Sequence, residues 1–261
     1  MGDMTYIKVQ HDDELAIVSI DRQEKLNALN AEVVQELGEV FTRLGDDDTV
    51  RAVILSGAGE KAFVAGADIG ELSTMSSMSG VAVSRAGQEV FRAIELFPKP
   101  VIASISGYAL GGGCELALAC HLRVASENAR FGLPEVGLGI IPGYGGTVRL
   151  TRLVGLGRAI ELTLSGEVIG AERAQAIGLV SLVAKPGAVM DEAKLLARKI
   201  TKNGPVAVRL ALESIYRALD AGTEAALGFE SSAFGLLAST EDMKEGMQAF
   251  LDKRKAEFKG L

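Results

Sequence analysis

Two glutamates stand out because each lies in a glycine-rich segment, where an acidic side chain is unusual. Glu115 follows the run Gly-Gly-Gly at residues 111–113, inside the apolar stretch 109–120, and has no cationic neighbour in the sequence. Glu135 lies among the glycines and prolines of residues 131–146. Paired carboxylates perform general acid–base catalysis when one holds a proton while the other accepts one. The two segments therefore predict acid–base chemistry.

Backbone N–H groups near these segments offer a second kind of chemistry. If a helix begins near Gly112, its N–H is unpaired, lies at the positive end of the helix dipole and points to the same side as Glu115. Asp68 and Glu71 have the spacing of a capping box, which predicts a helix start that leaves the N–H of Ala67 free. Paired N–H groups stabilise an oxyanion formed from a carbonyl. With the two glutamates, they predict proton transfer next to a thioester or similar carbonyl, through an enolate-like transition state.

Short strands alternating with helices must position these groups. Residues 53–55 and 101–105 have the mostly apolar character of buried strands, and the second leads through a tight turn into the helix that carries Glu115. Asn30 is placed to cap an amphipathic helix with apolar positions from Val33 to Leu44. Residues 73–80, rich in Ser and Met, predict a mobile loop or a loose helical turn. Further strands are expected at 7–10, 15–20 and 122–125, and a further helix at 87–97. This alternation indicates an α/β fold of repeated strand–strand–helix units, without a repeat visible in the sequence.

The character of the chain changes to helices with almost no strand after Val148. Amphipathic segments predict helices at 188–200, 206–219, 224–237 and 243–258. We therefore expect a core with the catalytic site at residues 1–200 and a helical region at 201–261.

Composition excludes several other classes of protein. The net charge of −7 gives no general attraction to nucleic acid or anionic membranes. Residues 101–120 are long enough for a membrane span, but they contain four glycines and Glu115. Two cysteines and two histidines provide neither a zinc site nor a disulfide framework, and the N-terminus lacks the features of a signal peptide. These features predict a protein of the reducing cytoplasm.

Common catalytic motifs are also lacking. A fragment of the dinucleotide pattern at residues 57–62 is not followed by the helix that such a site requires. There is no G-x-S-x-G elbow or P-loop, and His11 and His121 are poorly placed for a triad.

Three segments together carry a family resemblance: AGADI at 65–69, GYALGGGCEL at 107–116 and LPEVGLGIIPG at 133–143. The chain resembles the crotonase superfamily, specifically the enoyl-CoA hydratases, in the family's order from residue 25 to residue 255. The resemblance implies a crotonase-like spiral of ββα units with a C-terminal helical trimerisation region. It also implies reversible syn addition of water to a trans-2-enoyl-CoA, giving a 3-hydroxyacyl-CoA.

The same resemblance assigns roles to residues of this chain. It implies that the amides of Ala67 and Gly112 form the oxyanion hole, and that Glu115 activates water for attack at Cβ. Glu135 would deliver a proton to Cα, and the Gly143 amide would help to place the water.

Contacts with coenzyme A and between subunits are implied as well. The expected contacts with the acyl-CoA thioester are Lys25, Ala65, Asp68 and Ile69, with Phe250 and Lys253 from the C-terminal region of the same chain or of a neighbouring subunit. A homotrimer or a homohexamer is implied. No metal or redox cofactor is expected, because coenzyme A is part of the substrate.

Two departures from the family pattern are present. Gly70 stands where a Lys is often found, which puts one phosphate contact in doubt. His121 stands where an Asp is usual, and its imidazole either shifts the working pH range or is simply structural.

The alternatives stay open at this point. They are double-bond isomerisation, dehydration of a particular hydroxyacyl-CoA, and a non-catalytic or RNA-binding member of the family. The presence of both glutamates favours water chemistry, and the net charge disfavours RNA. Met75 and Met78 line the acyl pocket in one interpretation and face solvent in the other. Acyl chain length and pathway, whether fatty-acid oxidation, amino-acid breakdown or polymer metabolism, are not determined.

Overall fold

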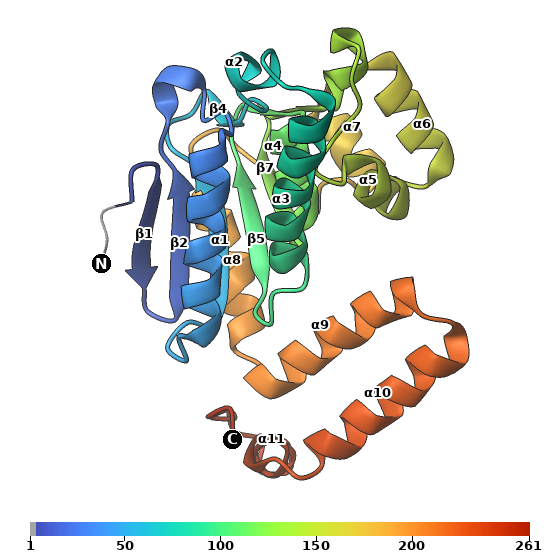
Figure 1. The fold of residues 1–261 in the computed structure, drawn as a ribbon. Coiled ribbons are helices and arrows are strands. Elements are labelled where there is room, and N and C mark those ends of the chain that lie inside the picture. Colours follow the sequence, from blue (N-terminus) through green and yellow to red (C-terminus); the bar gives the residue numbers. More distant parts are fainter. Residues whose placement is uncertain (1–3) are drawn as a thin grey trace.

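Strands in the computed structural model, which describes residues 4–261, form two sheets. The six-stranded sheet has the order β1-β2-β3-β5-β7-β10, and the four-stranded sheet has the order β4-β6-β8-β9 (Figure 1). The larger sheet contains β1 (Ile7–Asp12), β2 (Leu15–Ile20), β3 (Ala52–Gly57), β5 (Val101–Ile105), β7 (Leu122–Ser126) and β10 (Leu182–Ala184). The smaller sheet contains β4 (Ala62–Val64), β6 (Tyr108–Leu110), β8 (Arg130–Gly132) and β9 (Ile169–Gly170).

From β3 to β8, consecutive strands alternate between the two sheets, and this produces the repeat. β3, β5 and β7 each join the larger sheet, and the strand that follows each of them joins the smaller one. The helices that follow are α1 (Ala31–Asp46) after β2, α2 (Ile69–Leu72) and α3 (Ser77–Glu95) after β4, and α4 (Gly112–Ala119) after β6. The predicted α/β spiral of ββα units is confirmed.

The core lies on both faces of the larger sheet. Val53 and Leu55 face the cluster that includes α1 and α3, whereas Ile54 and Ile102 face α8 (Val189–Thr201) on the other side. Figure 1 shows α1 and α3 in front of the strands and α8 behind them. Because strands buried on both faces carry mostly apolar side chains, residues 53–55 form a continuous apolar run, and 101–105 form a run interrupted only by Ser104.

The first helix begins where the sequence predicts. The Asn30 side chain accepts a hydrogen bond from the Val33 amide at 2.9 Å. The apolar positions between Val33 and Leu44 are buried against the sheet.

The start of α3 corrects the expectation for residues 73–80 and 87–97. The helix begins at Ser77, because Ser76 and Ser79 cap it reciprocally: the Ser79 amide donates to Ser76 Oγ at 3.2 Å, and the Ser76 amide donates to Ser79 Oγ at 2.8 Å. Residues 77–80 thus form its first turn, and the expected start at residue 87 is wrong. Serine can replace the usual Glu in the reciprocal cap, so the usual pattern misses this start.

The capping box predicted at Asp68 is half correct. Asp68 caps α2 by accepting from the Gly70 amide at 3.0 Å. The Glu71 side chain, however, accepts from the Ala31 amide at 3.1 Å and ties α2 to α1 instead of closing the box.

The C-terminal part contains more strand than predicted. β9 and β10 follow Val148, and β10 pairs in parallel with β7 at the edge of the larger sheet. Between β8 and β10 lie the short helix η2 (Pro134–Leu138) and the helices α5 (Gly146–Val154), α6 (Leu156–Ser165) and α7 (Ala171–Ala176).

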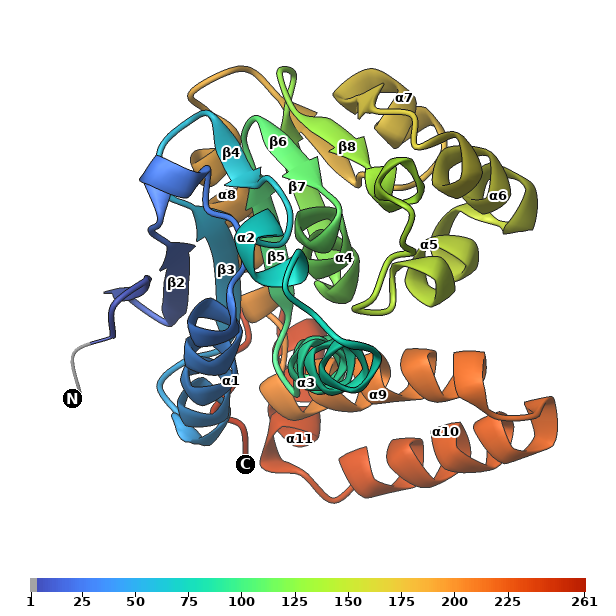
Figure 2. The same ribbon diagram turned by 45° about the horizontal axis from the view of Figure 1, so that its top comes forward.

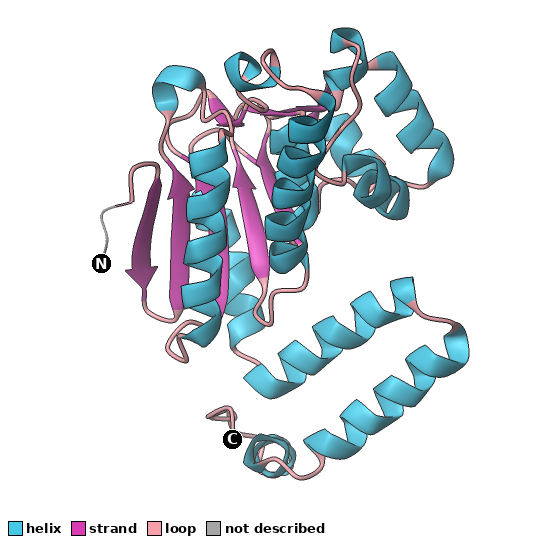
Figure 3. Cartoon of the chain, in the orientation of Figure 1, coloured by secondary structure: helices cyan, strands magenta, loops and turns pink. Residues whose placement is uncertain are grey.

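Residues 205–261, the C-terminal arm, extend away from the sheets (Figures 1 and 2). The arm contains α9 (Pro205–Asp220), α10 (Thr223–Leu237) and α11 (Glu241–Leu251). α11 ends at Leu251 and not at residue 258, because the tail folds back and the amides of Lys259 and Gly260 donate to Asp242. Figure 3 shows the contrast between the mixed core and the helical arm. The domain boundary at residue 200 stays a prediction.

In the part of the chain that the structure describes, no helix combines the length and apolarity of a membrane span.

Candidate active site

The three glycines before Glu115 bring α4 close to two other segments. Gly111 has a positive φ of 51°, and a Cβ there would lie 3.0 Å from Glu135 Oε1. A Cβ on Gly113 would collide with the Val64 carbonyl of β4. Only glycine permits both the turn and the close approach. The run therefore places Glu115 beside Glu135 and against the smaller sheet.

The Glu115 carboxylate is buried and held on one oxygen. Its residue is 2% exposed, and Oε1 accepts hydrogen bonds from the amides of Tyr144 at 2.8 Å and Gly146 at 2.7 Å. Burial raises the pKa of Glu115 to about 7; the nearby Glu135 raises it too, whereas the two amides lower it. A carboxyl with a pKa near neutrality can accept and return a proton at physiological pH.

Glu135 has a different environment. It lies in the first turn of η2, which Pro134 opens, and burial raises its pKa. Its Oε2 atom is buried and has no hydrogen-bond partner among the described residues. Because an unpaired buried oxygen is costly, this atom is set to pair with a bound molecule or to carry a proton.

The amides of Ala67 and Gly112 lie side by side and are free. Neither amide donates a hydrogen bond within residues 4–261. By contrast, the Asp68 amide donates to the Leu29 carbonyl at 2.7 Å, and the Leu29 amide donates to the Gly66 carbonyl at 2.8 Å. A Cβ built on Gly112 would lie 3.6 Å from the Ala67 nitrogen. The pair therefore has the arrangement that an oxyanion needs.

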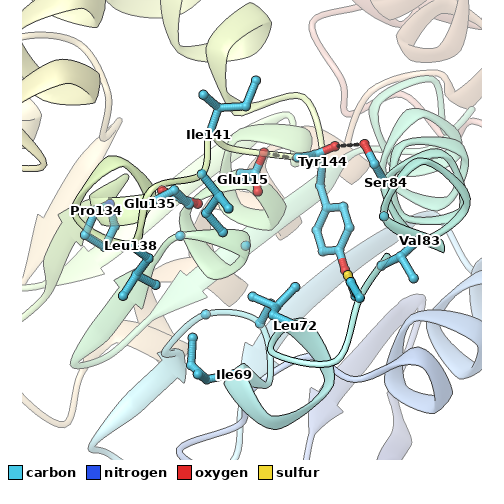
Figure 4. A pocket seen from close by; sticks show the side chains of 18 of the residues that line it. Ile69, Leu72, Val83, Ser84, Glu115, Pro134, Glu135, Leu138, Ile141 and Tyr144 are labelled. Atoms are coloured by element: carbon cyan, nitrogen blue, oxygen red, sulfur yellow. Dashed lines mark hydrogen bonds between the residues drawn. The ribbon is translucent and has the colours of Figure 1, made fainter. Parts of the chain in front are cut away.

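One pocket collects all of these groups (Figure 4). Ala67, Gly112, Glu115, Glu135 and Gly143 all line it. Its remaining wall is largely apolar and includes Ile69, Leu72, Met75, Val83, Leu138, Ile141 and Tyr144. Two acid–base groups and two backbone donors thus face an apolar chamber.

Comparisons with known proteins agree with this geometry. A family model described as enoyl-CoA hydratase/isomerase matches residues 10–261. The chain belongs to the enoyl-CoA hydratase/isomerase family. The predicted crotonase-type resemblance is therefore confirmed.

Relatives and solved structures of this family match nearly the full chain. A short-chain-enoyl-CoA hydratase from Clostridium acetobutylicum is 49% identical and is matched over 98% of both chains. A crotonyl-CoA hydratase from Syntrophomonas wolfei is 46% identical over 97% of both chains. The crystal structure of an enoyl-CoA hydratase from Bacillus anthracis superposes with a TM-score of 0.95 at 41% identity, covering 98% of this chain and 100% of that one.

The residues expected to contact coenzyme A divide into two groups in this hydratase/isomerase fold. Ala65 and Ile69 line the pocket, and exposed Lys25 lies close by, because the Ala65 amide donates to the Leu26 carbonyl at 3.1 Å. Asp68 forms an ion pair with Arg22, whose Nη2 lies 2.8 Å from Asp68 Oδ2. Phe250 and Lys253 lie on the C-terminal arm and do not line the pocket of their own chain.

Sequence reasoning missed several lining residues. Tyr144 lines the pocket, and its ring lies against Gly87, with its centroid 5.3 Å from the Phe91 ring centroid. Val83 and Ser84 come from α3, so an earlier helix start would have brought them into consideration. Met75 lines the pocket, as one of the two interpretations of this stretch predicted. Met78 is 80% exposed and does not line the pocket.

His121 is structural. Its Nδ1 accepts from the Val101 amide at 2.8 Å, so Nε2 carries the proton and donates to the Glu95 carbonyl at 3.1 Å. Burial lowers its pKa to about 4, which keeps the imidazole neutral near pH 7. It does not line the pocket, so the interpretation that it tunes the working pH is not supported.

Proposed function

We propose that this enzyme catalyses the reversible syn addition of water to a trans-2-enoyl-CoA. The observation that carries the proposal is the convergence of two buried glutamates and two free amides on one apolar pocket. As a hydro-lyase the protein matches its relatives, which carry that activity in their names over nearly the full chain.

Each group has a role in the proposed reaction. The thioester carbonyl accepts hydrogen bonds from the Ala67 and Gly112 amides, which stabilise the negative charge that develops on its oxygen. Glu115 takes a proton from water, and the remaining hydroxide adds to Cβ. The electron pair of the double bond moves toward the carbonyl, giving an enolate-like state.

Protonation of Cα completes the addition. Glu135 delivers this proton from the same side of the substrate, and the Gly143 amide, which makes no hydrogen bond within the described chain, helps to hold the water. Dehydration is the same sequence reversed. Because the whole water molecule is added, no electrons are gained or lost overall, and the reaction needs no redox cofactor. The two glutamates and two amides supply the acid–base groups and the oxyanion donors, and we propose that no metal takes part.

We propose that the preferred substrate has a short acyl chain. Tyr144 lines the pocket, and its ring packs against Gly87 and Phe91. The names of the Clostridium and Syntrophomonas relatives, short-chain-enoyl-CoA and crotonyl-CoA hydratase, support this preference. The hydration step of fatty-acid β-oxidation is the metabolic role that we propose.

We further propose that Lys25, Ala65, Asp68 and Ile69 contact coenzyme A, with Phe250 and Lys253 contributed by a neighbouring subunit. Phe250 is 82% exposed on the C-terminal arm, which supports its placement at another chain in a homotrimer or homohexamer. A cytoplasmic location fits the two unpaired, buried thiols of Cys114 and Cys120.

Loss of the enoyl-thioester absorbance with crotonyl-CoA tests the reaction. We expect Glu115→Gln and Glu135→Gln each to slow hydration by at least about 100-fold, as the loss of an acid–base group predicts. Glu172→Gln, on the exposed face of α7, is the matched control and should keep full activity. Unchanged rates in both pocket variants would overturn the proposal, and conversion of a 3-enoyl-CoA without hydration would identify an isomerase instead.

A further inference from the structure

Arg149 of α5 forms a hydrogen bond with Tyr144, the residue whose amide binds the Glu115 carboxylate. The Tyr144 amide donates to Glu115 Oε1 at 2.8 Å, and the Tyr144 carbonyl accepts from Arg149 Nη1 at 2.7 Å. Arg149 is 8% exposed and does not line the pocket. A single residue, Tyr144, therefore connects this buried guanidinium to the proposed catalytic base.

Glu95, at the end of α3, holds Arg149 in turn. Arg149 Nε lies 3.1 Å from Glu95 Oε2, and both side chains are buried. Arg92 Nη1 reaches the same oxygen at 3.0 Å from the partly exposed side. The rigid, planar guanidinium thus makes one bond toward α3 and another toward the Tyr144 carbonyl, which a flexible single ammonium group does not reproduce.

The backbone beside Arg149 is shaped around its guanidinium. Gly145 has a φ of 100°, and a Cβ on it would lie 2.6 Å from Arg149 Nη1. Any other residue would force the guanidinium away from the Tyr144 carbonyl. This glycine is an observation independent of the ion pair, and it indicates that the position of the Arg149 side chain is specified.

Stability alone does not account for the pair. A buried ion pair loses hydration on both partners, and apolar residues of similar volume often stabilise a fold equally well or better. What such a pair supplies is a fixed geometry. Here the fixed element is the turn at residues 142–146. Besides the Tyr144 carbonyl, the Gly143 carbonyl of this turn is also held: it accepts from Ser84 Oγ at 2.6 Å and from Gln88 Nε2 at 2.9 Å.

The charge of Arg149 also acts on Glu115. It lowers the pKa of that carboxyl, against burial and against the negative charge of Glu135 on η2. Cys114 and Tyr144, the other titratable groups close by, are neutral at pH 7, since burial raises the pKa of each to about 12. Arg149 is therefore the cation that opposes the burial of Glu115.

We propose that Arg149 is a positioning residue for Glu115, and that Glu95 holds the Arg149 guanidinium in place for this task. The proposal rests on the proposed function, in which Glu115 activates water. Arg149 would act in two ways: its hydrogen bond to the Tyr144 carbonyl sets the turn that positions the carboxylate, and its charge favours the ionised form of that carboxylate.

Steady-state hydration of crotonyl-CoA across a pH series, with Arg149→Met and Arg149→Lys, separates these two contributions. We expect Arg149→Met to lower kcat by at least about 10-fold and to move the acidic limb of kcat/KM to higher pH, because the cation is lost. KM should change less than about 2-fold, since Arg149 does not line the pocket. Arg149→Lys keeps the charge, so its acidic limb should stay in place while kcat still falls. Glu95→Gln should lower kcat in the same direction.

Arg173→Met on α7 is the matched control, because Arg173 forms its ion pairs with Glu161 and Glu167 on the surface. Folded Arg149 variants with wild-type kcat and an unmoved acidic limb would overturn the inference. If Arg149→Met does not fold, Arg149→Lys decides: unchanged kcat contradicts the role and a reduced kcat at constant KM supports it. Glu115→Gln in the same series separates the two proposals, since an active Glu115→Gln enzyme contradicts the proposed function and not only the role of Arg149.

Discussion

Glu115 and Glu135 are both buried, and their different hydrogen-bond partners assign them different roles. Two backbone amides stabilise the ionised form of Glu115. Glu135 Oε2 has no such donor within the described residues, and its protonated form is the one that burial favours. When two environments separate the behaviour of neighbouring carboxylates in this way, one becomes the base and the other the acid.

The burial of Glu115 should make the fold less stable at alkaline pH. Its pKa is raised from 4.5 to about 7 in the folded chain, so the folded state binds more protons than the unfolded state between these values. The free energy of unfolding therefore falls as pH rises through this window, by an amount on the order of 3 kcal/mol that is complete above pH 7. We expect Glu115→Gln to be more stable than the wild type at pH 8 and nearly equal to it at pH 4.5, in urea unfolding at fixed protein concentration. Glu172→Gln should show no such pH-dependent difference, and a pH-independent gain in Glu115→Gln would contradict the explanation.

At the scale of elements, the start of α4 decides the oxyanion site. Gly112 is the first residue of the helix, where an N–H has no carbonyl to bind within the helix. The amides of Leu29 and Asp68 are paired across the bridge between Leu29 and Ala67, which pins the Ala67 segment to Leu29 beside Gly112. The two free donors are therefore a product of one helix end and one pinned loop.

Gly112→Pro should abolish turnover while leaving the helix in place. Proline removes the N–H, and the first helical position tolerates proline because its φ already suits a helix. Leu156→Pro is the matched control, because it changes the first residue of α6, which is exposed and does not line the pocket. Circular dichroism checks folding and crotonyl-CoA hydration reports activity. A folded and fully active Gly112→Pro enzyme would remove Gly112 from the oxyanion hole.

At the scale of the whole molecule, the C-terminal arm exposes apolar side chains that a single chain leaves uncovered. Phe234 is 78% exposed and Phe250 is 82% exposed, and Met247 and Leu251 lie near Phe250 on α11. Apolar surface of this extent marks an interaction site. These exposed side chains support the proposed assembly of several copies of the chain through the arm.

Phe234→Glu should weaken subunit association, because burying an unpaired carboxylate at an apolar contact is costly. Light scattering with size-exclusion chromatography is expected to give a trimer or hexamer for the wild type and a smaller species for the variant. Leu195→Glu, at an exposed apolar position on α8 outside the arm, serves as the control. A wild-type protein with the mass of one chain would contradict the proposed assembly.

Local signals in the sequence predicted much of the core. The mostly apolar runs at 53–55 and 101–105 and the Asn30 cap are confirmed in β3, β5 and α1. Elements without a strong local pattern were missed. The start of α3 depends on a serine pair, and β10 has three residues that become a strand because they pair with β7.

The sequence by itself determined the chemistry that is present: two glutamates in glycine-rich segments, two amides at helix starts, and a family resemblance that spans the chain. Burial and distance were decided by the tertiary structure alone. Tyr144, Arg149 and Glu95 come together from three segments, and the raised pKa of Glu115 follows from its enclosure there. The physical reason is that a pattern along the chain reports local backbone preference, whereas desolvation and long-range hydrogen bonds arise only when distant segments pack.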